Sequence, residues 1–329
     1  MSRATVPVQL VYFGKLPSRG DFIRSANQAA LIQVLDTWLS QTMELMSADD
    51  ARWKVVYDTA PAVQFAFLGS RSPVGLAGHL VASSDTSGRR FPFISAGTFE
   101  VAEPLPFLAR SPLALNRLWT RFEASTRQAV GVSDFGQVQG QLAATSVDLE
   151  VSPDAYQANY IDFLEVQTLG SVEAMLTGAG HTVSMRQSLL AYGMLLQPVL
   201  TQGVRLLERG LVLPLPADAL YRPFVATLWV DLLASILQRS DVELALYLQT
   251  GAQRPQLVIG FNGASPHSLR SMLDSAALDA DNVFVAQAGW VEDHLGDDYG
   301  VKKLSSYMLD PQLSLLQAVK TFREVFLGE

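Results

Sequence analysis

Residues 75–99 read GLAGHLVASSDTSGRRFPFISAGTF, which is two apolar runs separated by a polar segment. Gly75–Ser83 and Phe91–Phe99 are predicted to be β-strands because both runs are apolar, short and bounded by turn-forming residues. Ser84–Arg90 between them is polar with a central glycine, which is typical of a hairpin loop. The stretch therefore predicts two neighbouring antiparallel strands.

The sequence around this hairpin adds further strands and helices. Val8–Phe13, Val55–Tyr57 and Val63–Leu68 are predicted strands. Apolar residues recur at helical spacing over 28–46, which predicts an amphipathic helix. Ser111-Pro112 is predicted to start another helix, with the serine as the cap and the proline in the first turn.

The elements beyond this region have the same mixed character. They are expected to be a helix within about 154–176, a helix at about 185–200, a hairpin formed by Val204–Leu207 and Leu211–Leu215, a helix at about 219–238, strands at Val242–Leu248, Leu257–Phe261 and Val283–Ala286, and a last helix starting at Asp310-Pro311.

Strands in hairpins without regular strand–helix–strand alternation predict an α+β fold. The chain has 329 residues, and about 100–200 residues per domain suggests two domains. We expect a mainly antiparallel sheet flanked by helices in an N-terminal domain at 1–135. A connecting region follows at 136–184, and a second α+β domain at 185–329.

Composition excludes several classes of function. The balance of 24 basic and 32 acidic residues gives a net charge of −8, which argues against nucleic-acid or anionic-membrane binding. The chain has no cysteine, so disulfides and thiolate chemistry are excluded. No apolar stretch offers the roughly 20 clean residues of a membrane span, and the N-terminus lacks the apolar core of a signal peptide. We therefore expect no membrane insertion.

A second dense loop, Phe13–Phe22, follows the first predicted strand. Gly14-Lys15 lacks both the upstream glycine and the following Ser or Thr of a phosphate-binding loop. Asp85, Arg89 and Arg90 could bind an anion, but a surface ion pair that orders the hairpin is the favoured interpretation. No motif predicts a catalytic residue, a metal site or a cofactor, so we expect a protein that is not an enzyme.

Three segments together resemble a known family. They are Gly14–Ile23, Trp38-Leu39 in the helix that follows, and Ser84–Phe93 with a Ser-x-Asp-x-x-Gly-Arg-x-Phe-Pro pattern. These segments resemble the TagF family, also called ImpM, of type VI secretion-associated proteins. The resemblance covers about residues 1–130. The resemblance implies a cytoplasmic bacterial repressor that acts after translation by binding a forkhead-associated-domain scaffold protein. It transfers no catalytic residue.

The candidate partner-binding residues lie in the two signature loops, which we expect to be close together. A loop rich in glycine and proline costs less entropy to order if it is already rigid, and Arg19, Asp21, Asp85 and Arg89 would then present complementary charge to a partner. Alternatively, Arg89 could pair with Asp21 or Asp85 and only brace the loops. The full set of candidates is Gly14, Lys15, Pro17, Arg19, Gly20, Asp21, Asp85, Gly88, Arg89, Phe91 and Pro92.

Two other functions stay open from the sequence. One is a sensor or enzyme with an anionic small ligand near Lys15 and Arg89. The other is a structural accessory subunit of the secretion apparatus. The sequence does not define the oligomeric state or the role of the C-terminal domain.

Overall fold

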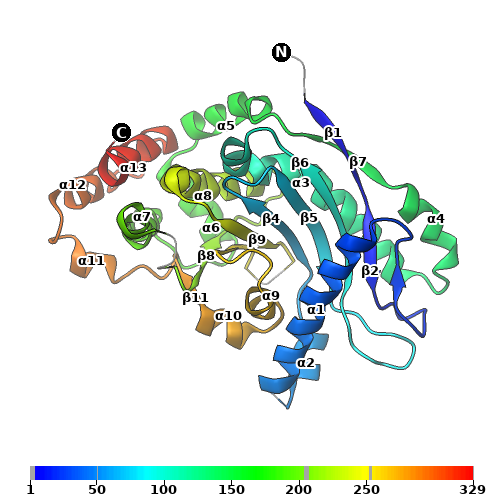
Figure 1. Cartoon of the computed structure of the whole chain (residues 1–329). Helices are drawn as coiled ribbons and strands as arrows, with labels where there is room; N and C mark the ends of the chain where they lie inside the picture. Colours follow the sequence, from blue (N-terminus) through cyan, green and yellow to red (C-terminus); the bar gives the residue numbers. More distant parts are fainter. Residues whose placement is uncertain (1–3, 50, 204–206, 252–253, 329) are drawn as a thin grey trace.

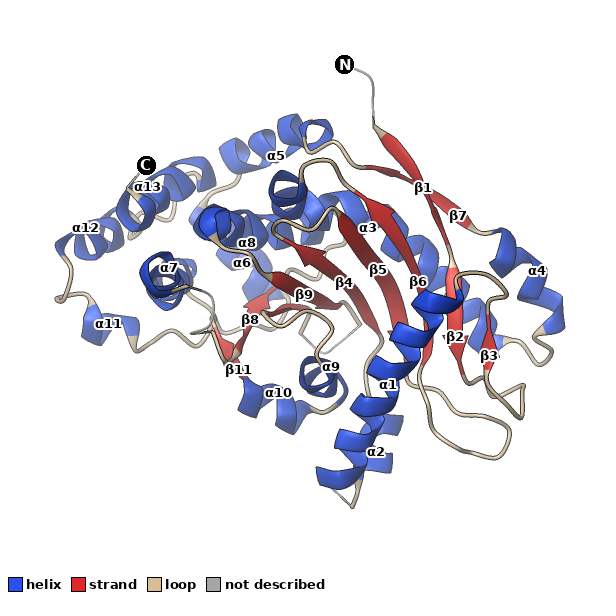
Figure 2. Ribbon diagram, viewed as in Figure 1, coloured by secondary structure: helices blue, strands red, loops and turns tan. Residues whose placement is uncertain are grey.

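One large sheet runs through both halves of the chain (Figures 1 and 2). The computed structural model describes residues 4–49, 51–203, 207–251 and 254–328. Over these ranges the sheet has nine strands in the order β11-β8-β10-β9-β4-β5-β6-β2-β3, and every pair is antiparallel except β11 with β8. The strands are β2 (Val11–Gly14), β3 (Ile23–Arg24), β4 (Val63–Gly69), β5 (Val74–Val81), β6 (Phe93–Glu100), β8 (Gly210–Pro214), β9 (Glu243–Gln249), β10 (Gln256–Gly260) and β11 (Asn282–Phe284).

Helices cover both faces of this sheet, so an α+β fold is confirmed. On one face, α1 (Ala29–Asp49), α2 (Trp53–Asp58), α9 (Pro266–Leu273) and α10 (Ser275–Asp281) contribute side chains to one buried apolar cluster. On the other face, α3 (Pro104–Gly131) and α8 (Arg222–Ile236) lie against the centre of the sheet. The alternation of β4 shows the two layers, because Phe65 belongs to the first cluster and Ala66 to the second.

The remaining elements extend the layer of α3 and α8. They are β1 (Thr5–Gln9), which pairs with β7 (Ser146–Glu150) in a separate ribbon, α4 (Gly136–Ala144), α5 (Asp154–Val166), α6 (Leu169–Gly178), α7 (Met185–Gln202), α11 (Val291–His294), α12 (Tyr299–Tyr307) and α13 (Leu315–Leu327). No helix in the described ranges combines the length and apolar character needed to cross a bilayer.

The junction between the halves is a strand pair in the middle of the sheet. β4 pairs with β9 over six residues, from Gln64 opposite Leu248 to Gly69 opposite Glu243. The boundary proposed at 136–184 stays a prediction, but the sheet and both apolar clusters include residues from both predicted domains.

Several predicted elements were wrong in type or in their starting point. Val55–Tyr57 lies in α2, where Trp53, Val56 and Tyr57 turn to the core at helical spacing. Ser111-Pro112 lies inside α3, which begins seven residues earlier at Pro104. Both Ser111 and Pro112 are buried in the stripe that packs on the sheet, so tertiary burial outweighs the backbone hydrogen bond that proline cannot make.

Other boundaries also differ from the predictions. The expected helix at 154–176 is split into α5 and α6, because Thr168 and Ser171 form a capping box that starts a new helix. The last helix begins at Leu315 and not at Asp310-Pro311, with the Ser314 hydroxyl accepting a hydrogen bond from the Gln317 amide. Val8–Phe13 is divided between β1 and β2.

The hairpin predicted around Glu208–Gly210 can be followed only in its second strand. Residues 204–206 of its first strand lie outside the described residues. The second strand, β8, pairs with β10 and β11.

Because β4 pairs with β9, we expect the two halves to unfold together. Leu246→Ala on β9 removes a fully buried side chain and should lower the free energy of unfolding by about 2–5 kcal/mol. Urea titration followed by tryptophan fluorescence and by circular dichroism should show one transition that moves as a whole. Leu309→Ala, at an exposed position, is the control and should change stability by less than about 0.5 kcal/mol. Two transitions, of which only one moves, would contradict a shared core.

Candidate functional site

The two signature loops leave the sheet side by side. Loop 1 (residues 15–22) follows β2, and loop 2 (residues 82–92) joins β5 to β6. β2 and β6 are antiparallel neighbours with Gly14 opposite Phe93, so the end of one strand meets the beginning of the other. In Figure 1 these are the blue and cyan loops at the lower right. The expectation that they lie close together is confirmed.

The buried carboxylate of Asp85 is the centre of the contact between the loops. Its side chain has no exposed surface, and Oδ2 lies 2.7 Å from Arg89 Nε and 3.1 Å from Lys15 Nζ. Oδ1 accepts hydrogen bonds from the backbone amides of Ser87 and Arg89 at 2.9 and 3.0 Å. The carboxylate thus connects a cation of loop 1 to a turn within loop 2.

These contacts determine the ionisation of Asp85. Burial alone would raise the pKa of its carboxyl group. The hydrogen bonds from the Arg89 amide, the Lys15 and Arg89 side chains and the Ser87 amide outweigh burial, and they hold the pKa well below its usual range. Asp85 is therefore a carboxylate throughout the neutral range.

Backbone groups add three more links between the loops. Arg89 Nη2 donates to the Gly20 carbonyl at 2.6 Å, and the Thr86 amide donates to the Arg19 carbonyl at 3.0 Å. Ser83 Oγ donates to the Lys15 carbonyl at 2.7 Å. Because backbone groups on both sides are engaged, the loops hold each other in one conformation.

An aromatic cluster lies beneath the same contact. The rings of Phe13, Phe22 and Phe91 are mutual neighbours, with centroids 4.8 to 5.8 Å apart. Lys15 Nζ lies 4.9 Å from the centre of the Phe22 ring, a cation–π distance. Phe13 and Phe91 are buried, whereas 43% of Phe22 is exposed.

Two glycines are required by the backbone of the site. Gly14 has φ of +132°, and a Cβ there would lie 2.0 Å from the Pro92 carbonyl oxygen. Gly88 has φ of +74° at the tip of loop 2, where the surrounding space is open. Gly14 therefore permits close packing against loop 2, and Gly88 permits the turn itself.

The predicted site residues separate into a buried and an exposed set. Gly14, Lys15, Asp85, Phe91 and Pro92 are buried and support the loops. The sequence predicts that Asp85 presents charge to a partner. Its side chain is fully buried, so it cannot do so. The exposed set is Pro17, Arg19, Gly20, Asp21, Gly88 and Arg89.

Hollows flank the joined loops on both sides. One, of about 570 Å³, lies between loop 1 and the start of α4, and its walls include Arg19, Phe22, Arg24 and Phe135. The other, of about 410 Å³, lies beside loop 2 and is lined by Pro17, Asp58 and Arg90 among others. The exposed loop residues thus form a ridge between two depressions, which we call the loop ridge.

The cations of the loops are already paired. Lys15 and Arg89 share Asp85, and Arg90 binds both carboxylate oxygens of Asp58 at 2.5 and 2.7 Å. Of the two alternatives for Arg89, the structure has the pair with Asp85, while Asp21 accepts a hydrogen bond from the Phe22 amide.

Sequence reasoning missed the residues that frame the loops. Tyr57 OH and the Ser83 backbone are hydrogen-bonded partners, and burial raises the pKa of Tyr57 far above its usual value. Asp58 on α2 pairs with Arg90, and Arg19 Nη2 lies 3.5 Å from Asp134 next to α4. No motif in the sequence points to these positions: Tyr57 falls in the predicted strand Val55–Tyr57, and Asp134 lies next to the predicted end of the N-terminal domain.

Comparison with known proteins identifies the part of the chain that contains these loops. Residues 11–145 match the model of the TagF N-terminal domain, described as type VI secretion system-associated. This segment is a TagF N-terminal domain. The match runs from β2 to the end of α4 and so contains both loops with α1, α2 and the strands between them. The resemblance to the TagF family is confirmed for this part.

The chain was also compared with solved structures and with curated proteins. A solved structure of PA0076 from Pseudomonas aeruginosa PAO1 is 26% identical, with a TM-score of 0.34. The similarity covers 42% of this chain and 64% of that one, so the chain spans less than two thirds of that relative. No curated protein matches the chain significantly.

Replacing the central carboxylate should have a pH-dependent effect. Asp85→Asn keeps the shape and an acceptor for the loop amides, but it leaves the buried Lys15 ammonium without its counter-charge. We expect a lower melting temperature at pH 7. Because folding lowers the pKa of Asp85, its carboxylate stabilises the fold above about pH 4 and loses this effect as the pH falls further.

Melting curves of wild type and Asp85→Asn between neutral pH and pH 3 test this expectation. The difference in melting temperature should be constant near neutrality and should narrow below about pH 4. Asp21→Asn, at an exposed carboxylate in the same site, should change little at any pH. A difference between wild type and Asp85→Asn that grows on acidification would be incompatible with this role.

Proposed function

We propose that this chain is a non-enzymatic regulator, a repressor, of type VI secretion. It would act in the bacterial cytoplasm by binding a forkhead-associated-domain scaffold protein. The association with type VI secretion follows from the TagF domain. The repressor role and the scaffold partner are the parts that we propose. The observation that carries this proposal is the pairing of Lys15 and Arg89 with the buried Asp85, which holds the two loops together as a preformed surface.

The geometry of the ridge supports recognition of a protein. Arg19, Asp21 and Arg89 offer charges of both signs, and Phe22 offers a partly exposed aromatic ring beside them. Aromatic residues and arginine are enriched in protein interfaces, and hollows on both sides can receive side chains of a partner. Binding to a surface that is already rigid also costs less entropy.

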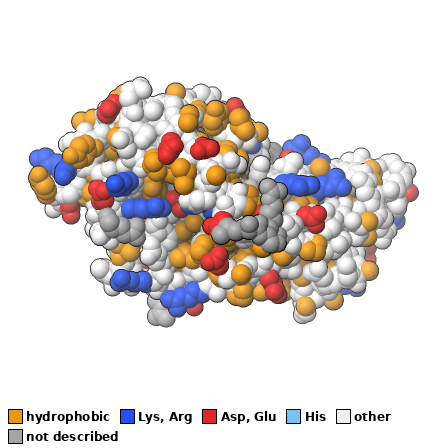
Figure 3. Space-filling model, turned by 90° about the horizontal axis from the view of Figure 1, so that it is seen from above, with side chains coloured by type: hydrophobic (Ala, Val, Ile, Leu, Met, Phe, Trp, Pro, Cys, Tyr) orange, Lys and Arg blue, Asp and Glu red, His pale blue; other side chains and the backbone are white. Residues whose placement is uncertain are grey.

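The pairing of the cations weighs against an anionic ligand at the same place. A phosphate or carboxylate at Lys15 would have to compete with the buried Asp85 carboxylate, which lies within hydrogen-bonding distance of both cations. The net charge of −8 also does not suggest a nucleic acid. On the face in Figure 3, Lys and Arg side chains occur in small groups among acidic and apolar ones.

Charge reversal on the ridge tests the proposal. Arg19→Glu and Asp21→Arg change exposed side chains, so the melting temperature should stay within about a degree or two of wild type. Affinity for the purified scaffold protein, measured by biolayer interferometry, should fall by at least about tenfold for each variant. Lys302→Glu on α12, at an exposed position in the C-terminal half of the chain, is the matched control.

Three outcomes would separate the possibilities. Loss of binding in the ridge variants with normal binding of Lys302→Glu supports the proposal. Wild-type affinity in both ridge variants rejects this surface. No binding of the wild-type chain rejects the partner, and co-purification with baseplate or sheath components would then favour a structural subunit.

A further inference from the structure

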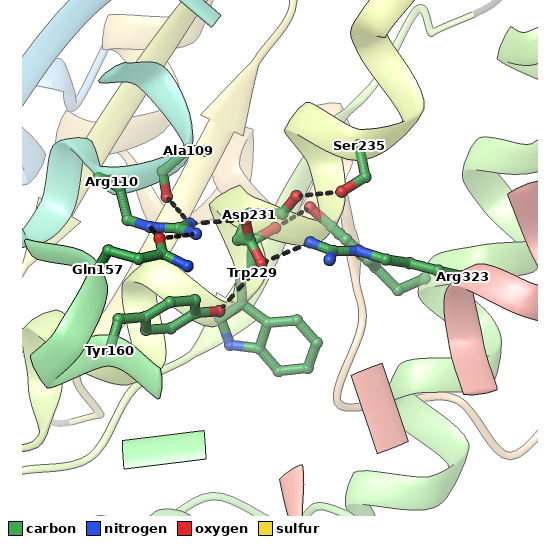
Figure 4. Close-up of polar contacts among 9 residues, drawn as sticks. Ala109, Arg110, Gln157, Tyr160, Trp229, Asp231, Ser235 and Arg323 are labelled. Carbon is green, nitrogen blue, oxygen red and sulfur yellow. Dashed lines mark hydrogen bonds and ion pairs between the residues drawn. The ribbon is translucent and has the colours of Figure 1, made fainter. Parts of the chain in front are cut away.

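A second cluster of charges lies far from the loop ridge, on the side of the molecule where α5 and α13 meet (Figures 1 and 4). Its centre is Asp231 on α8, whose side chain is only 7% exposed. Arg110 of α3 donates to Oδ1 at 2.6 Å, and Arg323 of α13 donates to Oδ2 at 2.8 Å. Figure 4 shows the two guanidinium groups approaching the carboxylate from opposite sides.

Tyr160 of α5 completes the ring of partners around Asp231. Its hydroxyl donates to Oδ2 at 3.2 Å, and burial together with the Asp231 charge raises the pKa of the phenol well above its usual value. Arg110 also lies over the Tyr160 ring, with 4.4 Å from Cζ to the ring centre. Four helices from distant parts of the sequence are thus connected through one carboxylate.

The two arginines differ in the number of hydrogen bonds that their guanidinium groups make. Arg110 donates from Nε and Nη2 to the Gln157 side chain, and from Nη1 to the Ala109 carbonyl as well as to Asp231. Arg323 has one hydrogen bond, from Nη2 to Asp231, and its buried Nε finds no partner among the described residues. A buried donor without a partner costs free energy, so Arg323 has unused hydrogen-bonding capacity.

A cavity of about 370 Å³ opens beside these groups. Apolar side chains of Ile161, Leu164, Leu316 and Val319 form part of its wall. Arg110, Arg323 and Lys320 supply three positive charges to the lining, while Asp231 and Glu324 supply two negative ones. The cavity therefore combines apolar walls with one positive charge in excess, and its volume is in the range of small-molecule sites.

We propose that this cavity binds a small monocarboxylate with an apolar tail. The carboxylate pairs with Arg323 and Lys320, and the tail lies against Leu164, Leu316 and Val319. The single negative charge of a monocarboxylate balances the one excess positive charge of the cavity lining. A phosphate dianion would exceed that balance and would leave the apolar wall uncovered. The site is independent of the regulatory function proposed above.

Hexanoate is a suitable probe, with hexanamide as its uncharged match. We expect saturation-transfer NMR on the full chain to detect hexanoate binding at millimolar concentration, and hexanamide to bind at least about tenfold more weakly. Arg323→Gln should reduce hexanoate affinity by about tenfold, and Lys320→Gln by severalfold. Lys302→Gln on the neighbouring helix α12 should bind like wild type.

The variants are chosen so that misfolding does not hide the answer. Arg323 also supports Asp231, so its replacement could lower stability, which circular dichroism would show. Lys320 is exposed and has no such role, so weaker binding by Lys320→Gln alone supports the proposal. Equal binding of hexanoate and hexanamide, unchanged affinity in Lys320→Gln, or no binding of hexanoate at millimolar concentration would overturn it.

Discussion

The buried carboxylate of Asp85 is the constraint on which the functional surface depends. A carboxylate without contact to water is stable only if charges and donors surround it, and here Lys15, Arg89 and two backbone amides do so. Because Lys15 belongs to loop 1 and the other donors to loop 2, moving one loop away from the other would separate the buried Lys15 ammonium from this carboxylate. The exposed residues between them therefore have fixed positions.

The sheet explains why this arrangement can form. Pairing of β2 with β6 brings residues 14 and 93 together, although almost eighty positions separate them. Pairing of β4 with β9 then joins the TagF domain to residues outside it, so the domain that carries the loops uses the second half as part of its core.

Local patterns predicted much of this structure, and long-range contacts account for what they missed. The alternation along Val63–Leu68 predicted β4, and the turn residues of 84–90 predicted the hairpin of β5 and β6. The helix start predicted at Ser111-Pro112 was wrong because burial of Pro112 inside α3 outweighs the preference of proline for the first turn of a helix. The strand predicted at Val55–Tyr57 was wrong because three residues are too few to show whether apolar positions repeat with the period of a helix or of a strand. The Asp231 cluster could not be predicted, since its members lie on four helices and no local pattern links positions 110, 160, 231 and 323.

Hydrogen exchange of the loop amides in the free protein tests the central claim most directly. The amides of Thr86, Ser87 and Arg89 donate to Arg19 or to Asp85, so they should exchange slowly without any partner present. In Asp85→Asn the same amides should exchange much faster, while those of the central strand β4 keep their protection. Fast exchange of the loop amides in the wild-type protein, with protection appearing only after a partner is added, would contradict a preformed surface.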